Sequence, residues 1–243
     1  MLFNRNDMYV GASLRKYGEF SPEETELFRQ IVRPGMTVVE AGANIGAHTI
    51  ELSRMVEPHG MVVAIEPQRL VFQVLCANLA LNSRANVFAH SCAVGAENGS
   101  ILVPVLPPDQ VSNFGGVSLR NAQQGELVPL RRLDDMGLAH CHVLKIDVEG
   151  MEVEVLRGAA GLIEEHRPAI YAENDRKERS EELLELLRAL NYRIFAHKPR
   201  LYSPVNFAGD AEDLFPGIVS MNLLCLPAER RMTIQGMPEV TAV

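Results

Sequence analysis

Four acidic residues end or directly follow segments that we predict to be strands: Glu40, Glu66, Asp147 and Glu173. Ligands of open α/β sheets bind in the crevice outside the carboxyl ends of the strands. Because like charges repel one another at such an edge, folding alone gives no reason to gather four acids there. The sequence therefore predicts a ligand-binding site at this edge of the sheet.

Residues Val38 to Thr49, V-V-E-A-G-A-N-I-G-A-H-T, predict a strand, a turn bracketed by Gly42 and Gly46, and a helix. This geometry brings a nucleotide-like ligand against bare backbone and the N-terminus of a helix. Glu40 would repel a pyrophosphate, whereas its carboxylate can accept hydrogen bonds from an ammonium group. The turn thus favours a ligand with an amino-acid moiety, such as S-adenosylmethionine, over a dinucleotide.

Glu66 follows the predicted strand Met61–Ile65 and lies twenty residues after Gly46. An acid at this position can bind the two hydroxyls of a ribose. The same spacing suits NAD, but Asn44 occupies the second glycine position of the G-x-G-x-x-G fingerprint, although Ala47 fits the third. The missing glycine removes the closest backbone approach to a pyrophosphate, so the sequence disfavours NAD.

Asp147, Glu173 and His48 are the candidates for a catalytic base. Glu173 and Asn174 follow a predicted strand and can supply a base or, with Asp147, oxygen ligands for a hard cation such as Mg²⁺. The alternative is an acidic N-terminus for the leucine-rich helix that follows. His48 lies in the first turn of the helix after the glycine turn, where a core or helix-capping role competes with catalysis.

Tyr17, Asn113 and Glu149 are candidates for contacts with the substrate. Tyr17 belongs to a polar N-terminal stretch with interspersed aromatic residues, and is either a core residue or part of a cap over the ligand. Asn113 lies in a loop rich in Pro, Gly, Asn and Gln at residues 107–125, and loops of this length are usually functional or disordered. Glu149 either belongs to the site or caps the helix after Gly150.

Strand patterns alternate with helical patterns along most of the chain. Apolar residues at helical spacing follow the glycine turn and recur in residues 71–79, 153–163 and 183–190. Alternation of this kind predicts an α/β protein with a doubly wound, mostly parallel sheet. The predicted strands are Thr37–Glu40, Met61–Ile65, Val87–Ala89, His142–Asp147, Ala169–Glu173, Tyr192–Ala196 and Met221–Leu226.

The chain divides into an N-terminal arm with a cap helix at residues 1–34, a main domain at 35–227 and a tail at 228–243. Ser21-Pro22-Glu23-Glu24 is a good start for the cap helix, with Ser as N-cap and Pro at the first position. Residues 97–132 interrupt the alternation of strand and helix patterns in the main domain. Two segments with strand character flank the long loop there, so we expect a β-hairpin-like insertion.

The composition fits one domain with a full core, since 47% of the 243 residues are hydrophobic. A net charge of −8 and a pI near 5.4 argue against nucleic-acid binding. Four scattered cysteines without a C-x-x-C motif predict a reduced protein with neither a zinc site nor disulfides. Because neither a signal peptide nor an apolar membrane-spanning stretch is evident, we expect a cytoplasmic chain without membrane contact. The sequence leaves open whether the chain forms a homodimer.

Four motifs stand out along the chain: V-V-E-A-G-A-N-I-G-A-H-T at 38–49, A-I-E-P at 64–67, C-A-V-G at 92–95 and V-L-K-I-D-V-E-G-M-E-V-E-V-L-R-G at 143–158. Together they resemble the FkbM-type S-adenosylmethionine-dependent methyltransferases, and the resemblance covers about residues 15–226. It implies a class I methyltransferase fold, with seven strands of which the last is antiparallel, and O-methylation of hydroxyls in sugars, polyketides and other natural products.

The resemblance also implies roles for particular residues. The loop from Glu40 to Gly46, including Gly42, Ala43 and Asn44, would hold the methionine side of the cofactor. Glu66, followed by Pro67, would bind the ribose, and Ala93 would lie near the adenine. Asp147 would face the methyl donor or the acceptor.

Methyl transfer is an in-line displacement for which the protein positions the acceptor and removes its proton. The predicted bases are Asp147, Glu173 and His48. Mg²⁺ bridging Asp147, Glu173 and Asn174 would acidify the acceptor hydroxyl. Alternatives are methylation of nitrogen or of a peptide or protein, a non-catalytic S-adenosylmethionine-binding module and a nucleotide-dependent oxidoreductase.

Overall fold

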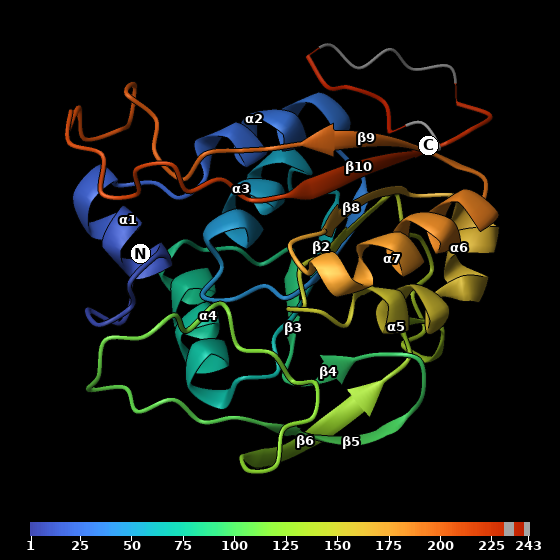
Figure 1. The fold of residues 1–243 in the computed structure, drawn as a ribbon, viewed down its shortest axis with the longest axis horizontal. Helices are drawn as coiled ribbons and strands as arrows, with labels where there is room; N and C mark the ends of the chain where they lie inside the picture. The colour runs from blue at the N-terminus through green and yellow to red at the C-terminus, as the bar shows by residue number, and fades with distance from the viewer. Residues whose placement is uncertain (231–235, 241–243) are drawn as a thin grey trace.

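The computed structural model describes residues 1–230 and 236–240, which form a seven-stranded sheet with the order β3-β2-β1-β7-β8-β10-β9 (Figure 1). β10 runs antiparallel to β8 and to β9, while the neighbouring pairs from β3 to β8 are parallel. The predicted doubly wound sheet is confirmed, and β10 inserts between β8 and β9. The strands are β1 (Thr37–Ala41), β2 (Met61–Ile65), β3 (Val87–His90), β7 (Val143–Ile146), β8 (Ala169–Glu173), β9 (Tyr192–His197) and β10 (Asn222–Pro227).

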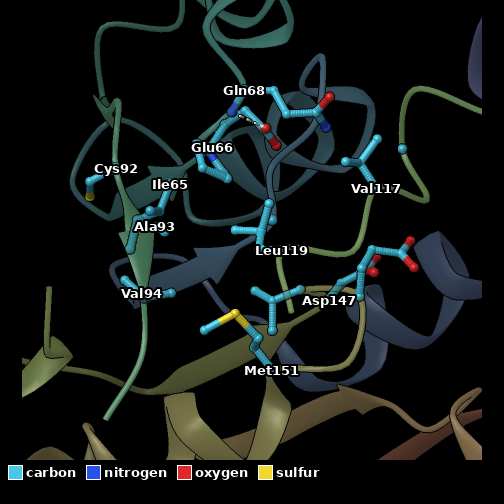
Figure 2. A pocket seen from close by; sticks show the side chains of 15 residues that line it. Ile65, Glu66, Gln68, Cys92, Ala93, Val94, Val117, Leu119, Asp147 and Met151 are labelled. Carbon is cyan, nitrogen blue, oxygen red and sulfur yellow. Dashed lines mark hydrogen bonds between the residues drawn. The ribbon is translucent and has the colours of Figure 1, made fainter. Parts of the chain in front are cut away.

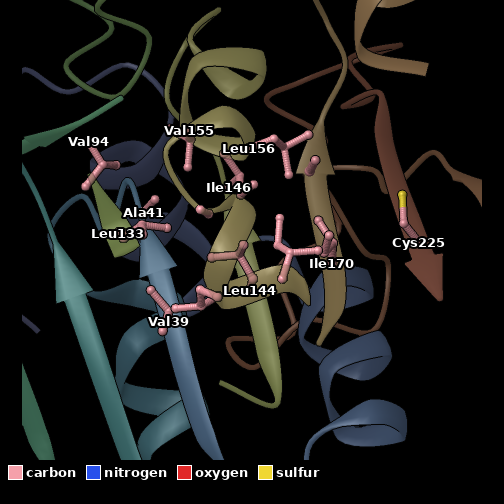
Figure 3. Close-up of a cluster of buried hydrophobic side chains, with 14 of the residues drawn as sticks. Val39, Ala41, Val94, Leu133, Leu144, Ile146, Val155, Leu156, Ile170 and Cys225 are labelled. Carbon is pink, nitrogen blue, oxygen red and sulfur yellow. The ribbon is translucent and has the colours of Figure 1, made fainter. Parts of the chain in front are cut away.

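Helices cover both faces of this sheet because its central strands are apolar on both sides. On one face, Phe28 and Leu52 of α2 and α3 pack against Val38 and Tyr171. On the other, residues of α5, α6 and α7 pack against Val39 and neighbouring strand residues (Figure 3). The helices are α1 (Val10–Tyr17), α2 (Pro22–Ile31), α3 (Ala47–Met55), α4 (Arg69–Leu81), α5 (Glu152–Arg157), α6 (Ala160–His166) and α7 (Lys177–Ala189), with a 3₁₀ turn at Leu133–Asp135.

The helical pattern at 153–163 forms two helices, α5 and α6, where the sequence suggested one. Gly158 lies between them, and a Cβ there would approach the carbonyl oxygen of Gly95 to 1.9 Å. The chain needs glycine at this position because the backbone passes against the loop that leads into the insertion.

The insertion contains the predicted hairpin: β5 (Gly99–Val103) pairs antiparallel with β6 (Glu126–Arg131). Residues 92–95 suggested a loop or a short strand, and they contain β4 (Ala93–Val94), whose parallel pairing with β6 the sequence did not predict. The long loop between β5 and β6 meets the N-terminal arm, where Met8 N donates to Ser112 O at 3.1 Å and Ser112 N donates to Asn6 O at 3.0 Å. Arm and loop are therefore joined, although about a hundred residues separate them in the chain.

The tail returns along the outer edge of β9. Ala196 N donates to Pro238 O at 2.9 Å, and Val240 N donates to Ile194 O at 2.7 Å. These bonds cover part of an edge strand that would otherwise expose free backbone groups. Part of the predicted tail, residues 231–235 and 241–243, lies outside the described residues. None of the helices in the described part of the chain is long and apolar enough to cross a membrane.

Candidate active site

Two adjoining cavities open at the carboxyl ends of the central strands. The first is a largely apolar slot that lies beside Glu66 and is lined by Ala93, Leu119 and Met151 (Figure 2). The second is a wider, polar cleft of about 1290 Å³, including the part open to solvent, which reaches from the glycine turn to Glu173. Gly42, Gly115, Asp147 and Glu149 line both cavities, so slot and cleft form one continuous site.

The glycine turn folds tightly against the neighbouring strand ends. Gly42 N and Ala43 N both donate to Ile65 O at 2.9 Å. Gly42 has φ +85°, and a Cβ there would lie 1.7 Å from the carbonyl oxygen of Asp147. Gly46, with φ +88°, precedes the first residue of α3. The turn thus leaves bare backbone at the junction of slot and cleft, as the sequence predicts for a nucleotide-like ligand.

Glu66 is fixed at the entrance of the slot by backbone groups. Its Oε2 accepts a hydrogen bond from Asn44 N at 3.0 Å. Its Oε1 accepts one from Gln68 N at 2.8 Å (Figure 2). Burial raises the pKa of this carboxyl to about 7. Pro67 and Ala93 line the same slot. The arrangement suits the predicted ribose contact, because each carboxylate oxygen retains a second lone pair.

Glu40 lies in a buried charged cluster beneath the cleft. Its Oε2 accepts a hydrogen bond from Thr49 Oγ1 at 2.6 Å, and its Oε1 lies 3.8 Å from Lys145 Nζ. Lys145 Nζ also donates to Asp147 Oδ2 at 3.1 Å. Burial would lower the pKa of Lys145, but Asp147, Glu40 and Glu24 raise it, so the lysine keeps its charge. Burial, opposed by Lys145, raises the pKa of Glu40 to about 7.

Sequence reasoning missed Lys145, although a signal for it exists. Lys145 precedes Asp147 by two residues, and it pairs in register with Glu40 on the adjacent strand. A lysine inside an otherwise apolar strand is rarely buried without acidic partners. The charge pattern of the two strands therefore pointed to an ion pair on one face of the sheet.

Three acids meet on the far side of the cleft. Carboxylate oxygens of Asp147, Glu149 and Glu173 all lie within 4.8 Å of one another. Burial, together with the neighbouring acids, raises the pKa of Glu173 to about 10 and that of Glu149 to about 7. Arg176 Nη2 donates to Glu149 Oε2 at 2.6 Å. The cluster joins two of the predicted metal ligands with Glu149, whereas the amide of Asn174 donates to Ser180 Oγ at 2.9 Å.

Glu149 does not cap the helix that follows it. The residue has φ +57° and turns its side chain toward Arg176. Glu152 instead fixes the loop that leads into α5, because its Oε1 accepts hydrogen bonds from Gly150 N at 3.0 Å and Val148 N at 3.3 Å. Glu149 lines both cavities, in keeping with the substrate contact predicted for it.

His48 and Glu24 form part of the opposite wall of the cleft. His48 Nε2 lies 3.8 Å from Glu24 Oε2, and Glu24 Oε1 accepts a hydrogen bond from Ser21 Oγ at 2.7 Å. The serine predicted as an N-cap makes no side-chain bond to the helix backbone. Sequence reasoning gave Glu24 no role in the site, because it took the spacing S-P-E-E only as a helix start.

The structure places Tyr17 away from the cleft. Its side chain is 1% exposed, and the hydroxyl donates to Glu212 O at 2.9 Å within the long β9–β10 connection. Tyr9, the N-cap residue of α1, lines the cleft. Asn113 also lines it, and its Oδ1 accepts a hydrogen bond from Gly116 N at 2.9 Å. The sequence could not place Tyr17, because the segment that its hydroxyl contacts lies about 200 residues away.

The sheet order and the glycine turn beside an acid-lined cleft define the class I methyltransferase architecture. The chain belongs to the FkbM methyltransferase domain family, whose model matches residues 40–194. This confirms the family that the sequence motifs resemble.

Individual proteins are similar to this chain. The chain is 30% identical over 143 residues to Methyltransferase 1 of Beauveria bassiana, a match that covers 50% of this chain and 57% of the relative. The solved FkbM methyltransferase of Methylobacillus flagellatus has a similar fold, with a TM-score of 0.52 at 21% identity, covering 82% of this chain and 50% of its own. The chain thus spans about half the length of these two proteins.

A more distant solved structure has the same fold. Fibrillarin of Aeropyrum pernix, solved with natively bound S-adenosylmethionine, has a TM-score of 0.51 at 12% identity and covers 84% of this chain and 74% of its own. At this identity the similarity concerns the fold alone.

Proposed function

We propose that this chain transfers a methyl group from S-adenosylmethionine to a hydroxyl of a small molecule, such as a sugar or a polyketide. The continuity of slot and cleft carries the proposal, because Asp147 lines both. A cofactor with its adenine in the slot would present its methionine end to an acceptor in the cleft. Membership of the FkbM family supports the reaction class.

The residues present fit this cofactor. The apolar walls formed by Ala93, Leu119 and Met151 suit a flat adenine ring. Glu66 would accept hydrogen bonds from the ribose hydroxyls, and the cofactor's ammonium group would lie near Glu40 and Asp147. Gly42 lies against the Asp147 backbone so closely that a Cβ there would collide with its carbonyl oxygen, which keeps the turn backbone bare on this side of the site. When bound, S-adenosylmethionine supplies an electrophilic methyl group on a sulfonium sulfur.

The cleft beyond Asp147 would bind the acceptor. Its polar groups, among them Asn113 and Glu173, suit a ligand with several hydroxyls, and Ile218 and Val219 add an apolar wall. Because the pKa of Glu173 is raised to about 10 by burial and neighbouring acids, its protonated form would donate a hydrogen bond to the acceptor at neutral pH. Glu173 could act as the base predicted from the sequence only if a bound cation favoured its ionised form.

Mg²⁺ bound by Asp147 and Glu173, with Asn174 or Glu149, stays a prediction about this proposed reaction. Carboxylate oxygens suit a hard cation, while Arg176 already compensates part of the charge at Glu149. Loss of turnover in EDTA with recovery in Mg²⁺ would confirm the metal. An unchanged rate in EDTA would remove it from the mechanism.

Calorimetry with S-adenosylhomocysteine and, in parallel, NAD tests the cofactor first. We expect micromolar binding of the former and none of the latter. A screen with tritiated methyl donor then compares sugars and polyketide alcohols with amines and peptides as acceptors. Methylation of amines or peptides alone would replace the O-methyltransferase proposal, and cofactor binding without turnover on any acceptor would point to a binding module.

A further inference from the structure

His48 has an unusual environment for a buried histidine. Its side chain is 7% exposed, and neither ring nitrogen has a hydrogen-bond partner among residues 1–230 and 236–240. Phe28 packs edge-on against the ring at 5.4 Å between centroids, and Phe20 packs against it at 5.6 Å. Buried polar groups are normally hydrogen-bonded, so two orphaned nitrogens on a cleft-lining ring call for an explanation.

Glu24 is positioned to orient this ring. Its Oε2 lies 3.8 Å from His48 Nε2, while its Oε1 is held by the hydroxyl of Ser21. Catalytic hydrogen bonds are often long in structures without substrate and tighten in the productive complex. In one recurring arrangement for activating hydroxyls, a carboxylate orients the base and a third group holds that carboxylate in place.

We propose that His48 takes the acceptor's proton on Nδ1, and that Glu24 is a positioning residue that holds the Nε2–H side of the ring. This rests on the proposed function. The acceptor O–H proton passes to Nδ1, and the oxygen lone pair forms the new O–CH₃ bond. The S–CH₃ bond breaks with its electrons kept by sulfur, which leaves S-adenosylhomocysteine, while Glu24 stabilises the imidazolium.

The charges around His48 keep the imidazole neutral before reaction. Burial, helped by the Lys145 cation and opposed by Asp147, lowers the pKa of His48 to about 3. The ring therefore enters the reaction with a free lone pair at neutral pH. Both ring nitrogens are shielded from solvent in this structure, so an acceptor reaches Nδ1 only when a covering side chain moves, and Phe20, which packs on the ring and also lines the cleft, is the candidate.

The two carboxylates predicted as bases fit this task less well. The Asp147 side chain already accepts a hydrogen bond from the buried Lys145 ammonium at 3.1 Å, so one of its oxygens is engaged before an acceptor binds. Glu173 lies among carboxylate oxygens of Asp147 and Glu149 that are all within 4.8 Å of one another, so its immediate neighbours are acids and not a group that could orient it as a base. Among the three candidates, His48 combines a neutral ring with unoccupied nitrogens.

The test measures methyl transfer to p-nitrophenyl glycosides for His48→Gln, Glu24→Gln and the double variant. We expect turnover to fall about 100-fold or more for His48→Gln, the usual contribution of a general base, and less for Glu24→Gln. The Glu24→Gln effect should disappear in the His48→Gln background, because a positioning residue acts through the base. His59→Gln and Glu26→Gln, both exposed, serve as controls with unchanged turnover.

Binding and rescue separate chemistry from folding. Each variant should bind S-adenosylhomocysteine with wild-type affinity, and imidazole should restore turnover to His48→Ala. Wild-type turnover in His48→Gln would overturn the role of His48, and additive losses in the double variant would overturn that of Glu24. Failure of the wild-type chain to bind the cofactor would instead refute the proposed function.

A second measurement needs no acceptor. Long-range ¹H–¹⁵N NMR reports which ring nitrogen carries the proton. We expect the neutral Nε2–H tautomer of His48 at pH 7 in the wild-type chain, and a mixed population in Glu24→Gln. A predominant Nδ1–H tautomer in the wild-type chain would overturn the proposal, because the nitrogen assigned as the base would already be protonated.

Discussion

At the scale of single residues, the site depends on carboxylates whose protonation is set by burial. Glu66 and Glu40 are 4% and 1% exposed, and burial raises the pKa of each to about 7. Each is nevertheless held by hydrogen bonds that suit the ionised form, from backbone groups for Glu66 and from Thr49 for Glu40. A ligand that donates hydrogen bonds to these acids would therefore favour their charged state.

Glu66→Ala is expected to weaken S-adenosylhomocysteine binding by more than tenfold, because the charge-assisted bonds to the ribose are lost. The substitution also frees Asn44 N and Gln68 N, so part of the loss comes from a looser turn. Calorimetry measures the effect, with the exposed Glu97→Ala as the control. Unchanged affinity would refute the ribose assignment of Glu66.

Cofactor affinity should also depend on pH. Below a pKa of about 7 the carboxyls of Glu66 and Glu40 are protonated, and above it they are ionised. Because the cofactor donates hydrogen bonds to the ionised forms, we expect its affinity to rise from pH 6 to pH 8. Calorimetry across this range checks the direction, and Glu66→Gln should flatten part of the dependence. An affinity that falls with rising pH would contradict both assignments.

At the scale of elements, the glycine turn brings β1 and β7 together at the junction of slot and cleft. Two glycines near β1 have similar backbone angles but different surroundings. Gly42 has φ +85° and faces the carbonyl of Asp147, while Gly35 has φ +82° and a Cβ there would meet no described atom within 4 Å. Substitutions at Gly42 and Gly35 therefore separate the energetic cost of a left-handed backbone angle from the cost of a steric clash with a neighbouring residue.

Gly42→Ala is expected to abolish cofactor binding and lower the melting temperature, because its Cβ would lie 1.7 Å from the Asp147 carbonyl oxygen. Gly35→Ala should cost only the strain of a left-handed residue, about 1–2 kcal/mol, and should bind the cofactor normally. Calorimetry and thermal unfolding of both variants distinguish these effects. Equal losses of affinity in the two variants would show that the close approach to Asp147 is unimportant.

At the scale of the whole molecule, segments far apart in the sequence enclose the site. The N-terminal arm is bonded to the insertion loop through Asn6, Met8 and Ser112. The same loop supplies Gly115 and Leu119 to the slot. α1 in turn packs beside the β9–β10 connection through Tyr17 (Figure 1). A cofactor in the slot would therefore contact the β5–β6 loop, which the N-terminal arm holds through these hydrogen bonds.

Cofactor binding is expected to protect this loop from proteolysis. Leu119 is buried against the slot, and the next residue, Arg120, is exposed and is a trypsin site. S-adenosylhomocysteine should slow cleavage after Arg120 because opening the loop would break its contact with the ligand. Mass spectrometry of a time course measures the rate, and NAD should have no effect. Equal cleavage with and without S-adenosylhomocysteine would place the cofactor away from Leu119.

Local patterns in the sequence determined most of the fold. Strand and helix periodicities, the glycine turn and the acids at strand ends are set by residues within a few positions of one another. These features predicted the doubly wound, mostly parallel sheet and the hairpin of the insertion, and most of the site residues predicted from them line the two cavities. The family motifs lie in the same local segments, which is why they could be recognised without a structure.

Only the tertiary structure decided which side chains meet across elements. The packing of α1 against the β9–β10 connection buries Tyr17, and the packing of α2 on α3 brings Glu24 to His48. Pairing of β1 with β7 likewise sets Lys145 beside Glu40. Such contacts depend on helix rotation and strand register, which are fixed by apolar packing over the whole core and not by the spacing of the polar residues themselves.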